Sequence, residues 1–202
     1  MRRWRCPPLR AEQLLAWIQT VLKIAILGAE CTGKTTLLAD MAGHLRAQGA
    51  RVNVVDEVLR HWCAAQGRTP RADEQAAIMQ AQIAAVDAAT ACDYLLCDTT
   101  PLVTAVYSDL LFGDHTLYPT AVAQQRRYQL TVLAMTDLPW RADGIQRDGP
   151  AARDRVDQRL REVLQNHALP VHPVGGLGAA RLVSALAALA QFQAGTPAGV
   201  SV

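Results

Sequence analysis

One ten-residue stretch, GAECTGKTTL from Gly28 to Leu37, constrains the fold of this chain more than any other segment. The pattern G-x-x-x-x-G-K-[ST] is matched there by Gly28, Gly33, Lys34 and Thr35. In this pattern the glycines let backbone N–H groups turn inward around phosphate oxygens. The apolar run LKIAIL precedes the stretch, and a helical pattern follows it. A strand, this loop and a helix in that order predict a phosphate-binding loop with the positive end of the helix directed at the anion.

The rest of the chain alternates between short apolar runs and longer helical stretches. We expect strands over residues 23–27, 52–56, 94–98, 129–135 and 170–174. We expect helices over residues 34–48, 72–91, 101–112, 152–167 and 179–192. Apolar strands joined by helices are typical of a parallel sheet covered on both faces. The sequence therefore predicts an α/β fold, a three-layer P-loop NTPase fold with a sheet of about five parallel strands and helices on both faces.

One long loop and two ends interrupt this alternation. Residues 136–153, TDLPWRADGIQRDGPAAR, hold prolines, glycines and arginines without apolar periodicity, and we expect them to form a lid. Residues 1–22 are interpreted as an N-terminal extension, 23–193 as the P-loop domain and 194–202 as a flexible tail.

Composition and charge disfavour several other classes of protein. The formal net charge is +2, and four of the first ten residues are arginines, so the body of the chain is not basic and no nucleic-acid partner is expected. The five cysteines are scattered without a CxxC pair, which favours a reducing, cytoplasmic location. No apolar stretch approaches the length of about 18 residues that a membrane helix needs, so no membrane span is expected.

A phosphate-binding loop requires a further carboxylate near the metal ion. The segment DYLLCD places Asp98 at the end of an apolar strand, the edge where ligands bind in open α/β sheets. We expect Asp98 and the Thr35 hydroxyl to hold Mg²⁺. The following residues, DTTP, are also good helix-capping chemistry, and the two interpretations are compatible.

More charged groups follow the strand at 52–56 and lie in the long loop. Asp56 or Glu57 could accept a proton from an acceptor hydroxyl; alternatively, both acids begin a helix, where the helix dipole favours them. Arg141, Arg147 and Arg153 could neutralise charge during phosphoryl transfer, with a solvated arginine-rich loop as the alternative.

Four segments together resemble the ribosylnicotinamide kinase domain of NadR-type proteins, a P-loop small-molecule kinase of the AAA-like NadR/kinase family. They are GAECTGKTTL, EVLR at 57–60, CDTTPLVTAVYSDLLFG at 97–113 and DLPWRADGIQRD at 137–148. The resemblance runs over about residues 23–182. It implies an ATP-dependent kinase that transfers the γ-phosphoryl group to the 5′-hydroxyl of nicotinamide riboside, giving nicotinamide mononucleotide in NAD salvage.

The resemblance also implies roles for individual residues. ATP would be bound by Gly28, Glu30, Cys31, Thr32, Gly33, Lys34, Thr35 and Thr36. The catalytic residues would be Lys34, Glu57, Asp98 and Arg147. The small-molecule acceptor would be bound by Glu57, Arg60, Tyr107, Trp140 and Asp143. ATP and Mg²⁺ are the cofactors expected, with Thr35 and Asp98 as the metal ligands.

The lid departs from the pattern of the riboside kinases, because Ile145 and Gln146 both stand between the DG pair and Arg147. A P-loop kinase for another nucleoside or small alcohol, or a nucleotide-binding regulatory ATPase, therefore stays an alternative. For a cationic pyridinium ring we expect Trp140 and Tyr107 to form an aromatic wall through cation–π attraction, with core packing as the alternative.

Overall fold

The computed structural model describes residues 21–89, 91–141 and 149–195, and within them the chain forms one parallel β-sheet. Its strands are β1 (Leu22–Leu27), β2 (Val52–Val55), β3 (Tyr94–Asp98), β4 (Leu130–Ala134) and β5 (His172–Val174). They lie in the order β2-β3-β1-β4-β5, and each neighbouring pair is parallel. The predicted α/β fold class is confirmed, and each predicted strand is present with ends shifted by two residues at most.

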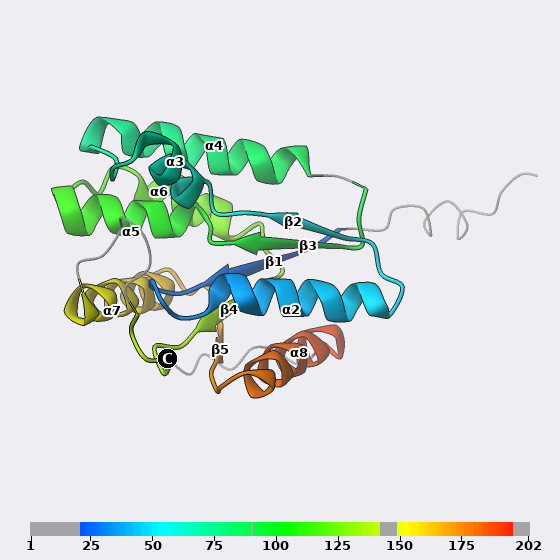
Figure 1. Ribbon diagram of the computed structural model, residues 1–202. Helices are drawn as coiled ribbons and strands as arrows, with labels where there is room; N and C mark the ends of the chain where they lie inside the picture. Colours follow the sequence, from blue (N-terminus) through cyan, green and yellow to red (C-terminus); the bar gives the residue numbers. More distant parts are fainter. Residues whose placement is uncertain (1–20, 90, 142–148, 196–202) are drawn as a thin grey trace, which may run out of the picture.

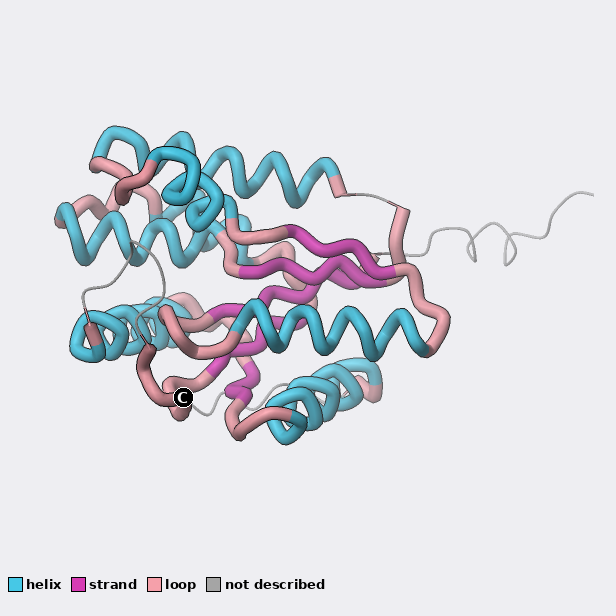
Figure 2. Tube along the Cα trace, viewed as in Figure 1, coloured by secondary structure: helices cyan, strands magenta, loops and turns pink. Residues whose placement is uncertain are grey.

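Helices cover both faces of this sheet (Figures 1 and 2). One face is packed by α2 (Lys34–Ala47) and α8 (Ala179–Gln193). The other is packed by α4 (Gln75–Ala88), α5 (Pro101–Phe112), α6 (Tyr118–Gln125) and α7 (Pro150–Asn166). Because successive side chains of a strand point to opposite faces, β1 contributes to both cores. Ile24 and Ile26 pack with α2 and α8, whereas Ala25 and Leu27 pack with α5 and α7.

Some helix boundaries differ from the prediction. The structure contains two helices that were not predicted, α3 (Val58–Gln66) with nine residues and α6 with eight. The predicted helix at 72–91 begins as a 3₁₀ turn, η1 (Ala72–Glu74), and continues as α4. Helix α7 begins at Pro150, so the end of the predicted lid is helical; proline suits this position because its missing N–H would have no helical partner.

The carboxyl ends of the parallel strands meet at one edge of the sheet, and each leads into a segment that sequence analysis singled out. β1 leads into the glycine-rich loop, β2 into Glu57 and β3 into Asp98. β4 leads into the predicted lid, and β5 into the loop at 175–178. Parallel pairing alone therefore brings these segments together from distant parts of the sequence.

Candidate active site

The glycine-rich loop runs from the end of β1 to the first turn of α2. Gly28 has a φ of 146°, and a Cβ there would lie 2.8 Å from the carbonyl oxygen of Ala134. Gly33, with a φ of 75°, directly precedes α2. Only glycine adopts these conformations without strain, which explains both glycines of the sequence pattern. The Lys34 ammonium donates a 2.7 Å hydrogen bond to the Ala29 carbonyl, so its charge lies within the loop.

Asp98 lies beside this loop because β3 pairs with β1 in a register that places it opposite Ile26. Its Oδ2 accepts a 2.6 Å hydrogen bond from the Thr35 hydroxyl. Its Oδ1 is buried and has no hydrogen-bond partner among the described residues. Mg²⁺ prefers oxygen ligands and is commonly held by one or two carboxylates together with substrate phosphates. A carboxylate with an unpaired oxygen next to a hydroxyl therefore fits the predicted metal position.

Thr100, two residues after Asp98, is the N-cap of α5. The Thr100 hydroxyl accepts a 3.3 Å hydrogen bond from the Leu102 N–H and donates one of 2.7 Å to Gln125 Oε1. Thr100 thus caps α5, which the compatible interpretation of DTTP predicts. The Asp98 carboxylate is left at the edge of the sheet.

Arg181, in the first turn of α8, contacts the backbone of the glycine-rich loop and supports it. This role was not predicted from the sequence. Only 5% of Arg181 is exposed, and its guanidinium donates to the carbonyls of Thr32, Val174 and Gly176 at 3.1–3.3 Å. It also pairs with Asp137, which accepts a second hydrogen bond from the Gly176 N–H. Burial alone would raise the pKa of Asp137, but the Gly176 N–H and the Arg181 cation together hold it below its usual value. Thr32 precedes Arg181 by 149 residues, so no local pattern reveals the contact.

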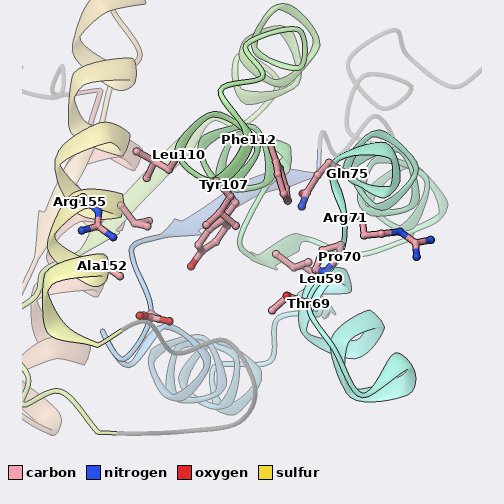
Figure 3. A pocket seen from close by; sticks show the side chains of 13 residues that line it. Leu59, Thr69, Pro70, Arg71, Gln75, Tyr107, Leu110, Phe112, Ala152 and Arg155 are labelled. Carbon is pink, nitrogen blue, oxygen red and sulfur yellow. The ribbon is translucent and has the colours of Figure 1, made fainter.

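Two cavities adjoin at the glycine-rich loop. The first, here called the acceptor cavity, has a volume of about 460 Å³ and is lined by Leu59, Tyr107, Leu110, Phe112, Val156 and others (Figure 3). The second, the loop cavity, has a volume of about 720 Å³ and is lined by residues 31–36 together with Arg60, Leu138, Pro139, Arg141 and Leu177. The consecutive residues Glu30 and Cys31 line one cavity each. A ligand in the acceptor cavity therefore lies next to whatever the loop binds.

Residues 67–74 form one wall of the acceptor cavity, and ion pairs within this segment hold its conformation. The Arg68 guanidinium donates to both carboxylate oxygens of Glu74 at 2.7 Å, and the Arg71 N–H donates to Glu74 at 2.8 Å. The hydrogen-bonded Arg68 guanidinium lowers the pKa of Glu74 to about 2. Arg68 also lies 4.9 Å above the ring of Trp62 in α3. These contacts fix the wall before any ligand binds.

Arg60 lines the loop cavity, and Glu57 lines neither cavity but contacts Arg60. Glu57 directly precedes α3 and is 8% exposed, and its Oε2 lies 3.4 Å from Arg60 Nε. Arg60 lines the loop cavity, so the carboxylate that it contacts is close to the predicted site of transfer. Asp56 is exposed. The alternative that these acids stand at the start of a helix also describes the structure, since α3 begins at Val58.

The predicted substrate-binding residues fall in different places. Tyr107 lines the acceptor cavity, in keeping with its predicted role. Trp140 lines neither of the two cavities that adjoin at the loop, and its indole nitrogen is buried without a partner among the described residues. Asp143 and Arg147 lie outside the described residues. The aromatic wall thus keeps structural support at Tyr107 but not at Trp140.

The other predicted lid arginines differ in what they contact. Arg141 lines the loop cavity, and its backbone carbonyl accepts a 2.9 Å hydrogen bond from the Cys31 thiol. Arg153 donates to the Leu138 carbonyl at 2.9 Å, so it ties the two ends of the predicted lid together. Arg155, which sequence reasoning missed, lines the acceptor cavity and makes no ion pair within the described parts of the chain. Its helical spacing from Ala152, which lines the same cavity, is a signal that could have found it.

A protein-family model described as an AAA domain matches residues 23–181. The chain belongs to this AAA-domain family. The matched residues of the AAA domain run from β1 to Arg181 and so include the loop, Asp98 and Arg181. No curated protein matches the sequence.

Solved structures similar to this AAA domain include two of NadR proteins. One, in complex with NR, has 19% identity and a TM-score of 0.68, over 90% of this chain and 52% of the other. A second, in complex with NAD and AMP-PNP, has 20% identity and a TM-score of 0.68, over 90% and 51%. A thymidylate kinase from Ehrlichia chaffeensis has 12% identity and a TM-score of 0.62, over 83% and 97%. The chain spans about half the length of the NadR chains, and at these identities the likeness shows the fold.

Within the described residues, no helix combines the length and the apolar character needed to cross a membrane.

Proposed function

We propose that this AAA domain is an ATP-dependent small-molecule kinase that transfers the γ-phosphoryl group of ATP to a hydroxyl, the 5′-hydroxyl of nicotinamide riboside, giving nicotinamide mononucleotide. The observation that carries the proposal is the pair of adjoining cavities, one along the phosphate-binding loop and one partly apolar beside it. The acceptor cavity, at about 460 Å³, has the size of a small-molecule site.

Several residues in and beside the loop cavity have a definite task in this proposal. Lys34 and the backbone N–H groups of the loop bind the outer phosphates and stabilise the charge that develops on the transferring group. Thr35 and Asp98 would hold Mg²⁺, which neutralises phosphate charge when bound. Arg60 lines the same cavity and contacts the proposed base, Glu57.

The acceptor hydroxyl must lose its proton as its oxygen bonds to phosphorus. We assign Glu57 as the group that accepts this proton. Glu30 is the other carboxylate at the junction, because it lines the acceptor cavity itself. The two residues are distinguished by comparing Glu57→Gln with Glu30→Gln. Asp56→Asn, at an exposed neighbouring position, is the matched control.

The test is ADP release by the full chain with ATP, Mg²⁺ and a panel of ribosides, with mass spectrometry of the acceptor product. We expect riboside-dependent ADP release and a product heavier by one phosphoryl group. Glu57→Gln should abolish turnover and keep nucleotide affinity, whereas Asp56→Asn should keep both. ATP hydrolysis at a rate that no riboside changes would contradict the kinase assignment.

A second acceptor class is favoured by one specific observation. Arg155 adds an exposed guanidinium to the acceptor cavity, and it makes no ion pair within the described parts of the chain. An acceptor that carries an anionic group, such as a nucleoside monophosphate, would use this charge. The same panel therefore includes nucleoside monophosphates, and Arg155→Met should weaken only the anionic acceptors.

A further inference from the structure

Gln75 is the one buried polar side chain among the described residues that line the acceptor cavity, and the proposed reaction does not yet use it. Gln75 is the first residue of α4 and is 1% exposed. It lines the acceptor cavity, toward which its carboxamide projects (Figure 3). Its Oε1 is buried and has no hydrogen-bond partner among the described residues.

Within the described parts of the chain, the other two buried glutamines are hydrogen-bonded at both the oxygen and the nitrogen of the carboxamide. Gln82 Oε1 accepts a 2.9 Å hydrogen bond from the Val58 N–H, and its Nε2 donates to the Asp56 carbonyl at 3.4 Å. Gln125 accepts from the Thr100 hydroxyl at 2.7 Å and donates to the Thr131 hydroxyl at 2.9 Å. A buried carboxamide without partners destabilises the fold, so buried polar groups are almost always hydrogen-bonded. Gln75 therefore differs from Gln82 and Gln125 in having an unpaired carboxamide oxygen, and it lines the acceptor cavity.

The surroundings of Gln75 are rigid and apolar. Glu74, the residue before it, is held by Arg68 at 2.7 Å through two hydrogen bonds and also caps η1. Leu59, Tyr107 and Phe112 line the same cavity as Gln75 and supply apolar surface from α3 and α5 (Figure 3). Apolar walls with a few placed polar groups are typical of a small-molecule site, and in such a site a buried polar group sets the orientation of the ligand.

Glu30 and Gln75 line the acceptor cavity from different elements and differ in chemistry. Glu30 belongs to the glycine-rich loop, where transfer would occur, whereas Gln75 begins α4. A carboxamide has both donor N–H groups and an acceptor oxygen, and half a turn about its last torsion exchanges them. Its best match is a group with the same pair, such as a ring carboxamide or the amide edge of a base.

We propose that Gln75 is a specificity-determining residue that hydrogen-bonds the amide-like edge of the acceptor's ring while the hydroxyl end of the acceptor faces the glycine-rich loop. This assignment rests on the proposed function. It names the acceptor class as nucleosides whose ring bears a carboxamide or an equivalent N–H and C=O pair. Acceptors with a bare ring would leave Gln75 unpaired and be selected against.

The test is a cycle of two acceptors and two proteins. The acceptors are nicotinamide riboside and the pyridinium riboside that lacks the carboxamide, so both carry the same ring charge. The proteins are the wild type and Gln75→Met, with Gln75→Leu as a second apolar variant and Gln80→Met as the control on the exposed side of α4. The readouts are kcat/KM for each acceptor and the thermal midpoint of each protein.

We expect the wild type and Gln80→Met to prefer the amide-bearing riboside by about tenfold or more in kcat/KM, the discrimination typical of one buried hydrogen bond. Gln75→Met and Gln75→Leu should reduce this preference to within about threefold, with unchanged or higher thermal midpoints, because an unpaired polar group has been removed. An unchanged preference in a folded Gln75 variant overturns the role of Gln75 alone. Failure of the wild type to phosphorylate either riboside overturns the proposed acceptor, and the role of Gln75 with it.

Discussion

Replacing Arg181 with methionine should destabilise the protein and loosen the phosphate-binding loop. The substitution keeps much of the apolar stem but removes the guanidinium that Thr32, Val174, Gly176 and Asp137 share. Removing one partner of a buried ion pair costs about 3–5 kcal/mol. The Asp137 side chain is 36% exposed, and water can solvate it in the variant, so we expect a loss near the lower end, about 3 kcal/mol. For a domain of this size, that loss lowers the thermal midpoint by about 6–12 °C.

The assay is thermal unfolding of wild type and variant, with and without excess ATP analogue. Arg127→Met is the matched control, because Arg127 and its partner Asp87 are 42% and 46% exposed. Such a surface pair contributes about 1 kcal/mol at most. Nucleotide should raise the midpoint of Arg181→Met less than that of the wild type, because the Thr32 carbonyl is no longer held. Equal midpoints for the two arginine variants would refute a supporting role for Arg181.

The pH dependence of this pair has a definite sign. The pKa of Asp137 is lowered in the folded protein, so its stabilising contribution is present above the ordinary value of 3.8 and is lost as the pH falls below it. The difference in midpoint between wild type and Arg181→Met should therefore shrink below pH 3.8. A difference that stays constant through this range would show that the ion pair with Asp137 contributes little.

Three further predictions concern other parts of the site. Asp98→Asn should reduce turnover by about 100-fold or more while the thermal midpoint is kept or raised, because a buried charge is removed; a near-normal rate would contradict the metal role. Glu74→Gln should be less stable than the wild type above pH 4.5, and the thermal midpoints should converge as the pH falls from 4.5 toward 2, since Arg68 holds the pKa of Glu74 at about 2; parallel profiles would contradict this. In a Cys6→Ser background, iodoacetamide should alkylate the partly exposed Cys31 before the buried Cys97, because burial raises the pKa of the Cys97 thiol to about 12. ATP should slow the alkylation of Cys31. Mass mapping that finds Cys97 alkylated first would count against the site.

Much of the fold could be predicted from sequence because its signals are local. The five apolar runs predicted the five strands, and the helical pattern at 152–167 predicted most of α7. The pattern G-x-x-x-x-G-K-[ST] predicted the loop because its glycines are required by local backbone conformation, as Gly28 and Gly33 show. The short α3 and α6 were missed, since nine and eight residues fall below the usual length of a helix in a globular protein.

The candidate site divides in the same way. Asp98 was predicted because it ends a strand, and strand ends converge at one edge of any parallel sheet. Gln75 was missed, because its neighbours in the acceptor cavity come from α3, α5 and α7 and no local pattern connects these helices. Arg155 was missed although its spacing from Ala152 on α7 is a local signal. Trp140 was expected at the ligand because it lies in a specific motif, yet it lines neither the acceptor cavity nor the loop cavity.

Local sequence patterns were sufficient to predict the strands, the glycine-rich loop and the acids at the strand ends, because each depends on residues close together in the chain. The residues that support the loop and line the acceptor cavity became known from the packing of distant segments. Arg181 reaches Thr32 across 149 residues, and the unpaired carboxamide of Gln75 is recognisable only once every atom around it has a position. Burial and pairing are properties of the packed molecule, and they separate a binding group from an ordinary polar residue.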